Sequence, residues 1–280
     1  MPHLKKPDWL KIRLGANENF SQTQNIIDNY GLHTICSSGR CPNQGECWSR
    51  GTATFMIGGD ICTRSCKFCN TKTGRPLSLN KSEPAFVAKS IQLMGLKHAV
   101  ITSVDRDDLP DYGAMHWIET INKIKEVNPN TTIEILIPDF QGQEKYIDLI
   151  CQASPNIISH NMETVRRLTP KVRSAAKYDI SLKVLKRIGE NGLRAKSGIM
   201  LGLGETMDEV EELMDDLLAM ECSVLTMGQY LQPTRKHLPV AEYIHPDIFA
   251  ELKQIAISKG FKYVESGPLV RSSYHAENCL

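Results

Sequence analysis

The sequence has 280 residues, 41% of them hydrophobic, which suits one large domain or two ordinary ones with a sizeable core. Lys and Arg number 33 and Asp and Glu 32, so the net charge is +1. This balance argues against a nucleic-acid or anionic-membrane protein, because both classes usually carry a basic excess. No stretch approaches the roughly 18 apolar residues of a membrane span, and no apolar run follows the basic start as in a secretory signal.

The nine cysteines are the most informative part of the composition, because six of them lie between residues 36 and 69. A small secreted protein spreads its cysteines as a disulfide framework. A long chain without a signal, with six cysteines in one segment, indicates an intracellular metal protein instead. We therefore expect a cytoplasmic protein.

The expected elements begin after an irregular segment of about fifty residues, which is rich in Asn, Gln, Gly and Pro. Short β-branched runs predict strands at 52–57, 98–103, 132–136, 156–159, 193–200, 223–227 and 262–265. Amphipathic stretches predict helices at 84–95, 112–127, 144–151, 179–191, 207–220 and 246–258, with a helical turn at 164–168. A Gly-Pro turn and an exposed tail follow the last strand.

The alternation of strands and helices predicts an α/β fold made of βαβ units around a parallel sheet. Six such units could form an open or partial barrel. A doubly wound sheet would give a similar order of elements, and periodicity alone does not choose between the two.

The first group of cysteines, Cys62, Cys66 and Cys69, follows the first strand and a Gly-Gly pair. Three thiolates on one loop can hold three irons of a cubane and leave the fourth iron open, whereas four-thiolate clusters are closed. The alternative is structural zinc, which usually takes four ligands in C-x2-C pairs, and no fourth partner lies nearby in the sequence.

With an aromatic residue, Phe68, before its last cysteine, this C-x3-C-x2-C segment resembles the signature of radical S-adenosylmethionine enzymes. The resemblance implies a [4Fe-4S] cluster on Cys62, Cys66 and Cys69. It also implies that the open iron chelates S-adenosylmethionine, which one electron cleaves to a deoxyadenosyl radical.

The second group of cysteines, Cys36, Cys41 and Cys47, has spacings too wide for a zinc knuckle, and free or buried thiols are the alternative. The sequence around them closely resembles the leader of the lipoyl synthase family. The resemblance extends over further segments at 59–64, 102–109, 138–140, 160–165, 196–198, 200–206, 228–233 and 271–276.

The lipoyl synthase resemblance implies a partial (β/α)6 TIM-type barrel at 51–260. An extension at 1–50 would carry the second [4Fe-4S] cluster, and a tail at 261–280 would close the barrel mouth. The fourth ligand of the second cluster is expected to be Ser273, with Ser272 as the alternative. Without the resemblance, the Arg-Ser-Ser-Tyr tail would be interpreted as a solvated terminus.

The resemblance also implies the reaction, in which two sulfur atoms from the second cluster are inserted at C6 and C8 of a protein-bound octanoyl chain. The implied partners are an octanoylated lipoyl carrier domain or glycine-cleavage H-type protein, an electron donor such as flavodoxin or ferredoxin, and an iron-sulfur carrier for cluster repair. No nucleic acid or membrane partner is expected, and we expect a monomer.

Five polar residues are expected contacts of S-adenosylmethionine: Asn161, Glu163, Arg173, Lys196 and Glu205. Four of them have an alternative interpretation. Asn161 could be a helix N-cap, Glu205 could belong to an ordinary βα turn, and the two cations could be paired surface charges.

Two positions depart from the family pattern, Tyr112 beside the expected pocket and Asn70 directly after the last cluster cysteine. Cys151 and Cys222 are expected to be core thiols, and Cys279 to be mobile. The basic start could meet an acidic partner or could be a plain solvated end; its residues are Lys5, Lys6, Lys11 and Arg13.

Two other classes of protein are the alternatives to this interpretation. Other radical enzymes, such as a biotin synthase or a methylthiotransferase, carry a second cluster on differently placed ligands. An electron carrier or a structural zinc protein would need closed metal sites and no large barrel.

Overall fold

The structure is a computed structural model that describes residues 4–11 and 17–279. Its contacts divide the chain into two compact units. The N-terminal unit contains residues 17–64 and 70–157, and the C-terminal unit contains residues 4–11, 65–69 and 158–279. None of the helices in these described residues is long and apolar enough to cross a membrane.

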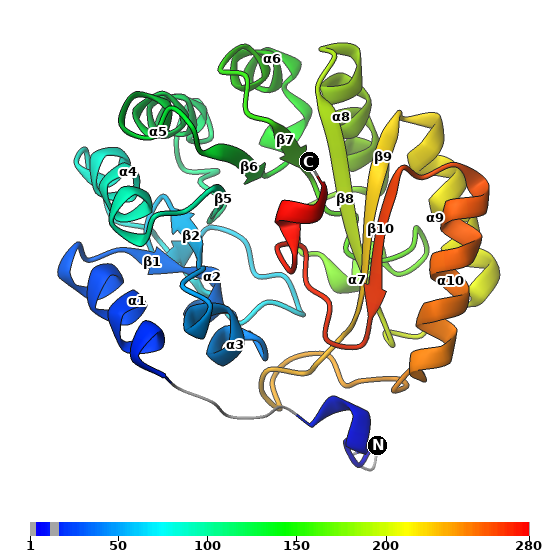
Figure 1. Ribbon diagram of the computed structural model, residues 1–280. Coiled ribbons are helices and arrows are strands. Elements are labelled where there is room, and N and C mark those ends of the chain that lie inside the picture. The colour runs from blue at the N-terminus through cyan, green and yellow to red at the C-terminus, as the bar shows by residue number, and fades with distance from the viewer. Residues whose placement is uncertain (1–3, 12–16, 280) are drawn as a thin grey trace. The chain divides into compact units, whose positions relative to one another are not determined.

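The N-terminal unit contains a largely parallel sheet with the strand order β1 (His33–Thr34), β2 (Thr54–Ile57), β5 (His98–Ser103) and β6 (Thr132–Leu136). β2, β5 and β6 run parallel, and β1 is antiparallel to β2. All four residues of β2 are buried, as is typical of a strand covered on both faces. Three helices follow in the same unit, α4 (Glu83–Met94), α5 (Ala114–Val127) and α6 (Glu144–Gln152) (Figure 1).

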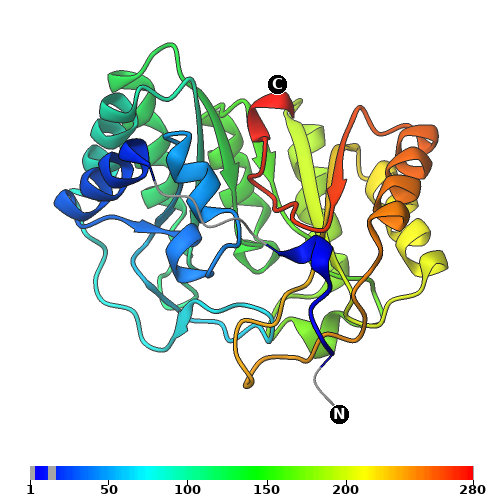
Figure 2. The same ribbon diagram turned by 60° about the horizontal axis from the view of Figure 1, so that its bottom comes forward.

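The chain passes into the C-terminal unit at β7 (Ile157–Ser159). There β8 (Arg194–Leu201), β9 (Cys222–Gln229) and β10 (Tyr263–Gly267) pair in parallel. The helices of this unit are α7 (Thr169–Val172), α8 (Tyr178–Glu190), α9 (Met207–Ala219) and α10 (Pro246–Lys259). The C-terminal turn η3 (Ala276–Cys279) lies beside β8, on the side away from α9 and α10 (Figures 1 and 2).

The structure confirms all seven predicted strands and all six predicted helices, with ends within two residues of the predicted ones. Local signals explain this agreement. α9 begins with a capping box between Thr206 and Glu209, and it buries Val210, Leu213, Met214 and Leu217 along one side. Gly95 ends α4 in the left-handed conformation at φ 62°, which a glycine adopts without strain.

The expectation of an irregular start is wrong, because residues 4–50 contain several short helices. They are η1 (Asp8–Leu10), α1 (Glu18–Asn29), α2 (Ile35–Ser38) and α3 (Gln44–Ser49). The α1 helix begins at Asn17, whose side chain accepts a hydrogen bond from the Phe20 N–H. It buries only Thr23 and Ile27, so its apolar periodicity is too weak to be recognised in the sequence.

Three smaller features also differ from expectation. The helical turn expected at 164–168 lies instead at α7, where Pro170 occupies the first turn. The two-residue strands β3 (Ile61–Cys62) and β4 (Lys72–Thr73) were not anticipated. The tail is packed rather than exposed, because Ala276 and Cys279 are buried, and Cys279 is therefore not a mobile end.

The two faces of α10 allow a direct test of the core. Leu252 is buried and Ile257 is 46% exposed on the same helix. Leu252→Ala should lower the free energy of unfolding by about 2–5 kcal/mol, because it removes buried methyl groups and leaves a cavity. Ile257→Ala should change it by less than about 0.5 kcal/mol. Urea denaturation of the metal-free protein measures both, and equal effects would contradict this assignment of the faces.

Candidate functional site

The second group of cysteines lies entirely in the N-terminal unit. Cys36 is in α2, Cys47 is in α3, and the Cys41 N–H donates to the Cys36 carbonyl at 2.9 Å. Burial, followed by the nearby Cys36 and Cys41, raises the pKa of the Cys47 thiol to about 12. Cys36 and Cys41 therefore lie near enough to Cys47 to act on its charge, within one unit of the fold. That the three sulfurs hold one cluster stays a prediction.

The surroundings of Cys36 suit a metal-bound thiolate. Burial, followed by the neighbouring Cys41, raises the pKa of Cys36, while hydrogen bonds from Thr54 act in the opposite direction. Hydrogen-bond donors around a sulfur stabilise its charged form and orient it toward a metal. In the described part of the chain, no group of three or more His, Cys, Asp or Glu side chains is placed to hold a single metal ion. A cubane places its thiolates farther apart than a single ion does.

The other cysteine segment begins in the N-terminal unit, where Cys62 ends β3. Its Sγ accepts backbone N–H groups from Arg64 at 3.4 Å and from Asp105 at 3.3 Å. The Asp105 carboxylate lies 3.6 Å from the same sulfur. Two N–H groups directed at one sulfur fit a thiolate that carries part of the charge of a cluster.

The Arg64 side chain, between Cys62 and Cys66 in the sequence, is buried among carboxylates. It donates to Asp107 at 2.7 and 2.9 Å and to Asp139 at 3.0 and 2.7 Å. Burial opposes the charge of Arg64, but the hydrogen bonds to Asp107 and Asp139 outweigh it and raise the pKa of the guanidinium. Sequence reasoning missed this arrangement.

The rest of the cysteine segment belongs to the C-terminal unit, which holds its backbone at several points. The Ser65 N–H donates to Ser174 Oγ at 3.1 Å, and the Lys67 N–H donates to the Val172 carbonyl at 2.9 Å. His237 Nε2 lies 2.9 Å from the Cys69 carbonyl. These contacts fix the backbone that carries Cys66 and Cys69, and neither Ser174 nor His237 was anticipated.

The two departures from the family pattern have local structural roles. The Asn70 side chain donates to the Ser38 carbonyl at 2.9 Å, which links the segment after Cys69 to the loop of the second cysteine group. Tyr112 adopts φ 53°, the left-handed region in which glycine is unstrained, and its ring packs edge-on against Tyr146. The turn at Tyr112 therefore keeps the conformation that a glycine would favour.

In the C-terminal unit, Asn161 joins two other polar residues. Its amide nitrogen donates to Glu163 Oε1 at 3.1 Å and to Ser272 Oγ at 2.8 Å. No helix begins at Asn161, so the N-cap alternative is wrong. Its buried Oδ1 has no hydrogen-bond partner among the described residues, which leaves an acceptor for a polar ligand.

Glu163 lies in the same buried environment. Burial raises the pKa of its carboxyl group, and the charge of Arg173 lowers it in part. Arg173 is only 9% exposed and donates to Ser181 Oγ at 2.8 Å, and Lys196 is fully buried. The interpretation of these two cations as paired surface charges is therefore wrong. Contact of any of these residues with S-adenosylmethionine stays a prediction.

Glu205 closes its own turn. Its carboxylate oxygens accept the backbone N–H groups of Gly202 and Leu203. Gly202 has φ 93°, and a Cβ there would lie 2.3 Å from the Glu242 carbonyl, so this turn requires glycine. The structure thus gives Glu205 the βα-turn role, and its contact with a cofactor stays a prediction.

The tail passes over β8 and β9. A Cβ on Gly198 of β8 would lie 2.6 Å from Thr226 Oγ1 and 3.2 Å from Ser272 Oγ, and one on Gly228 would lie 2.1 Å from the Val270 carbonyl. Glycine at these positions lets the tail pack directly on the two strands. The Ser272 hydroxyl accepts a hydrogen bond from Asn161, and the choice of Ser273 or Ser272 as a cluster ligand stays a prediction. The two core thiols expected from the sequence, Cys151 and Cys222, are buried.

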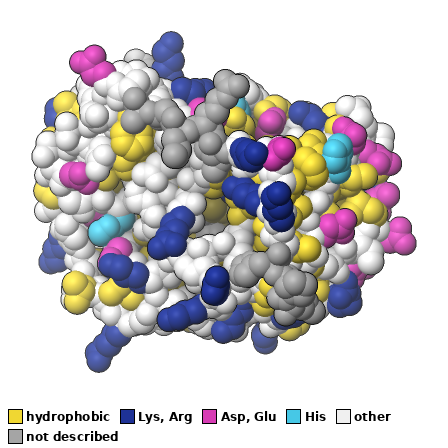
Figure 3. All heavy atoms as spheres, turned by 90° about the horizontal axis from the view of Figure 1, so that it is seen from below, with side chains coloured by type: hydrophobic (Ala, Val, Ile, Leu, Met, Phe, Trp, Pro, Cys, Tyr) yellow, Lys and Arg dark blue, Asp and Glu magenta, His cyan; other side chains and the backbone are white. Residues whose placement is uncertain are grey.

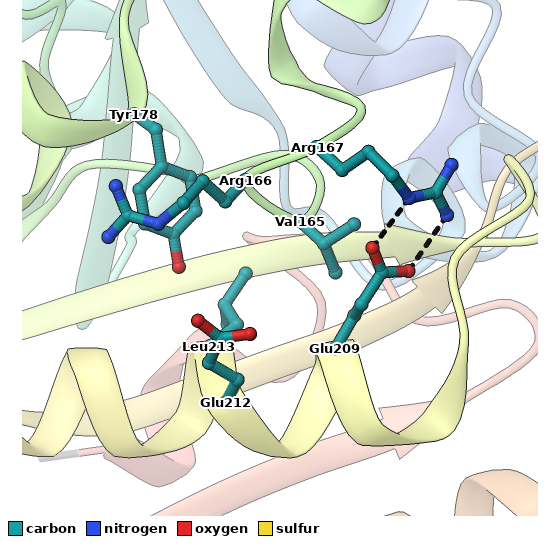
Figure 4. A pocket seen from close by; sticks show the side chains of 7 residues that line it. All are labelled: Val165, Arg166, Arg167, Tyr178, Glu209, Glu212 and Leu213. Atoms are coloured by element: carbon teal, nitrogen blue, oxygen red, sulfur yellow. Dashed lines mark hydrogen bonds and ion pairs between the residues drawn. The ribbon is translucent and has the colours of Figure 1, made fainter.

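A separate pocket of about 190 Å³ lies beside α9, lined by Val165, Arg166, Arg167, Tyr178, Glu209, Glu212 and Leu213 (Figure 4). Arg167 holds Glu209 by two hydrogen bonds of 2.7 and 2.8 Å. Arg166 pairs with Asp179 and Asp216 and lies over the Tyr178 ring. Because both arginines are paired with carboxylates, these contacts are structural.

Comparison with known proteins decides the family. The sequence profile of the Radical SAM superfamily matches residues 56–217. A lipoyl synthase of Parabacteroides distasonis is 70% identical over 275 residues, which cover 98% of each chain. The chain belongs to the lipoyl synthase family. Lipoyl synthases of Phocaeicola vulgatus and Treponema denticola are 68% and 60% identical, covering 99% and 98% of this chain and 98% and 94% of theirs.

Solved structures confirm the predicted fold class. Methylornithine synthase superposes with a TM-score of 0.57 at 13% identity, covering 93% of this chain and 86% of its own. Streptococcus suis SuiB bound to S-adenosylmethionine gives 0.60 at 10% identity, covering 80% and 54%. This lipoyl synthase family member is therefore a radical S-adenosylmethionine enzyme with a partial TIM-type barrel. The expected cofactors, [4Fe-4S] clusters and S-adenosylmethionine, follow from this membership.

The close packing of the tail at Gly198 can be tested by one methyl group. Gly198→Ala places a Cβ among Thr226, Asn161 and Ser272, and should lower the free energy of unfolding by about 1–3 kcal/mol. It should also speed proteolysis within the tail. Gly74→Ala is the control, because its Cβ would meet only Ile61 at an ordinary 3.5 Å. Unchanged tail proteolysis in Gly198→Ala would contradict the packing described here.

Proposed function

We propose that the chain inserts two sulfur atoms, at C6 and C8, into an octanoyl chain carried by a lipoyl carrier domain or a glycine-cleavage H-type protein in the cytoplasm. The observation that carries the proposal is the presence of two separate cysteine triads in a lipoyl synthase family member. The second triad, Cys36, Cys41 and Cys47, is gathered in one unit. The cofactors supply a radical able to remove hydrogen from an unactivated carbon, and sulfide for the new bonds.

The protein's own residues hold and shield these groups. Cys62, Cys66 and Cys69 would bind the first [4Fe-4S] cluster, with Cys62 oriented by two backbone N–H groups. Buried polar residues of the C-terminal unit would bind S-adenosylmethionine. Asn161 offers an unpaired acceptor, Arg173 and Lys196 offer cations to a carboxylate, and Glu163 and Glu205 offer acceptors to hydroxyl or amino groups. Their burial keeps water from a reactive radical.

We assign the fourth position of the second cluster to Ser273. A hydroxyl is a harder ligand than a thiolate and is more easily displaced from iron, which suits a cluster that must give up sulfur. We divide the chain into three segments, at 1–50, 51–260 and 261–280. Ser273 belongs to the third segment, the packed tail, which would bring it to the second cluster. Within the tail, Arg271 donates to the carbonyl of the neighbouring Val270.

The partners follow from the chemistry. An electron donor such as flavodoxin or ferredoxin must reduce the first cluster, and an iron-sulfur carrier must rebuild the second after each turnover. The basic start is a candidate contact for an acidic carrier domain. Lys5, Lys6 and Lys11 are exposed, and Arg13 lies outside the described residues. Partial burial, followed by the charge of Arg271, lowers the pKa of Lys6. Lys and Arg side chains gather near the middle of one face (Figure 3).

Mass spectrometry of an octanoyl-lysine peptide tests the proposal. The peptide is incubated anaerobically with the reconstituted full chain, S-adenosylmethionine and a reductant. We expect a product with two inserted sulfur atoms and the accumulation of deoxyadenosine. Deoxyadenosine without sulfur insertion would indicate a radical enzyme with a different substrate. The absence of both products, from a protein shown to hold both clusters, would contradict the proposal.

Paired serine variants extend the same experiment to the tail. Ser273→Ala should still form deoxyadenosine but should lose sulfur insertion, because the second cluster lacks its oxygen ligand. Ser272→Ala should keep both clusters, and any loss should be in S-adenosylmethionine binding, since Ser272 contacts Asn161. The reverse pattern would assign the ligand to Ser272.

A further inference from the structure

Cluster binding by Cys62, Cys66 and Cys69 does not by itself explain why a buried arginine lies between two of these cysteines in the sequence. Arg64 is 8% exposed and makes four N–H to oxygen bonds with two carboxylates. Asp107 follows β5 and Asp139 follows β6, and these are adjacent parallel strands. One guanidinium therefore ties the loop to the carboxyl ends of two neighbouring strands.

A second set of contacts joins the same loop to the segment after β5. Thr63 donates its backbone N–H and its hydroxyl to the Asp105 carbonyl, at 3.1 and 3.0 Å. The Asp107 N–H donates back to Thr63 Oγ1 at 3.1 Å. The two segments are thus paired along their backbones, and the Cys62 sulfur lies where the N–H groups of Arg64 and Asp105 converge.

We propose that Arg64 is a positioning residue that holds these two N–H groups on the Cys62 sulfur and thereby tunes the [4Fe-4S] cluster of the Cys62 loop. The inference rests on the proposed function. Hydrogen bonds to a ligand sulfur stabilise the reduced, more negative cluster and raise its reduction potential. Outer contacts of this kind also hold the ligand in place.

The geometry requires arginine rather than any cation. The guanidinium presents several donors in a rigid plane and can fork to two carboxylates at once, whereas a lysine ammonium is a compact point charge. Arg64→Lys therefore keeps the charge near Asp107 and Asp139 but loses the fork. Arg64→Gln loses both.

The experiment is a redox titration of the reconstituted full chain followed by electron paramagnetic resonance. Only the cluster with an open iron changes its spectrum when S-adenosylmethionine is added, which identifies the Cys62 cluster beside the second one. Arg64→Lys and Arg64→Gln should each shift its midpoint potential to a more negative value. Both should also retain iron about 10- to 100-fold less well against a chelator.

Arg166→Lys is the matched control, because Arg166 also bridges two aspartates but contacts no cysteine loop. It should leave the potential unchanged. An Arg64→Lys variant with the wild-type potential and iron retention would overturn the inference, since charge alone would then suffice. If neither Arg64 variant folds, the Asp107→Asn variant provides the test. A negative shift of its midpoint potential, smaller than the shift expected for the Arg64 variants, supports the inference. An unchanged midpoint potential overturns it.

The result for the wild-type chain distinguishes a failure of the proposed function from a failure of the role proposed for Arg64. A wild-type protein whose spectrum does not respond to S-adenosylmethionine would contradict the proposed function itself. A responsive wild-type protein with an unaltered Arg64→Lys variant would leave the proposed function standing and remove only the role of Arg64.

Discussion

The buried bonds of Arg64 to Asp107 and Asp139 are the contact on which the geometry around Cys62 depends. A buried arginine flanked by carboxylates is stable only while all partners are present, and breaking such a set costs ~3–5 kcal/mol. The same set joins the ends of β5 and β6 to the cysteine loop. These bonds come from the protein itself, and they fix the loop backbone around Cys62.

The surroundings of the cysteines and of Asn161 each suit a bound group of a particular chemistry. The Cys36 and Cys62 sulfurs face donors. Asn161 keeps one acceptor open beside the buried Glu163 and Arg173. The first arrangement fits metal thiolates, and the second fits a polar ligand with both positive and negative groups. A lipoyl synthase family member needs both kinds of site.

The sequence predicted features that leave a local signal and missed those that depend on distant contacts. β5 and β6 have the predicted ends because short apolar runs bounded by polar residues define them. α1 was missed because it buries only two side chains. The partners of Arg64 lie 43 and 75 residues away, and that of Asn161 lies 111 away, so no local pattern reveals them. The cysteine triads were recognised because their spacing is itself the chemical signature.

The most direct test of the account is the iron and sulfide content, with Mössbauer spectra, of two triple variants beside the wild-type chain. The wild type should hold two clusters. Replacing Cys36, Cys41 and Cys47 with alanine should remove one cluster and leave the one that responds to S-adenosylmethionine. Replacing Cys62, Cys66 and Cys69 should leave one cluster that does not respond. Unchanged iron and sulfide after the first replacement would contradict the claim that each triad holds its own cluster.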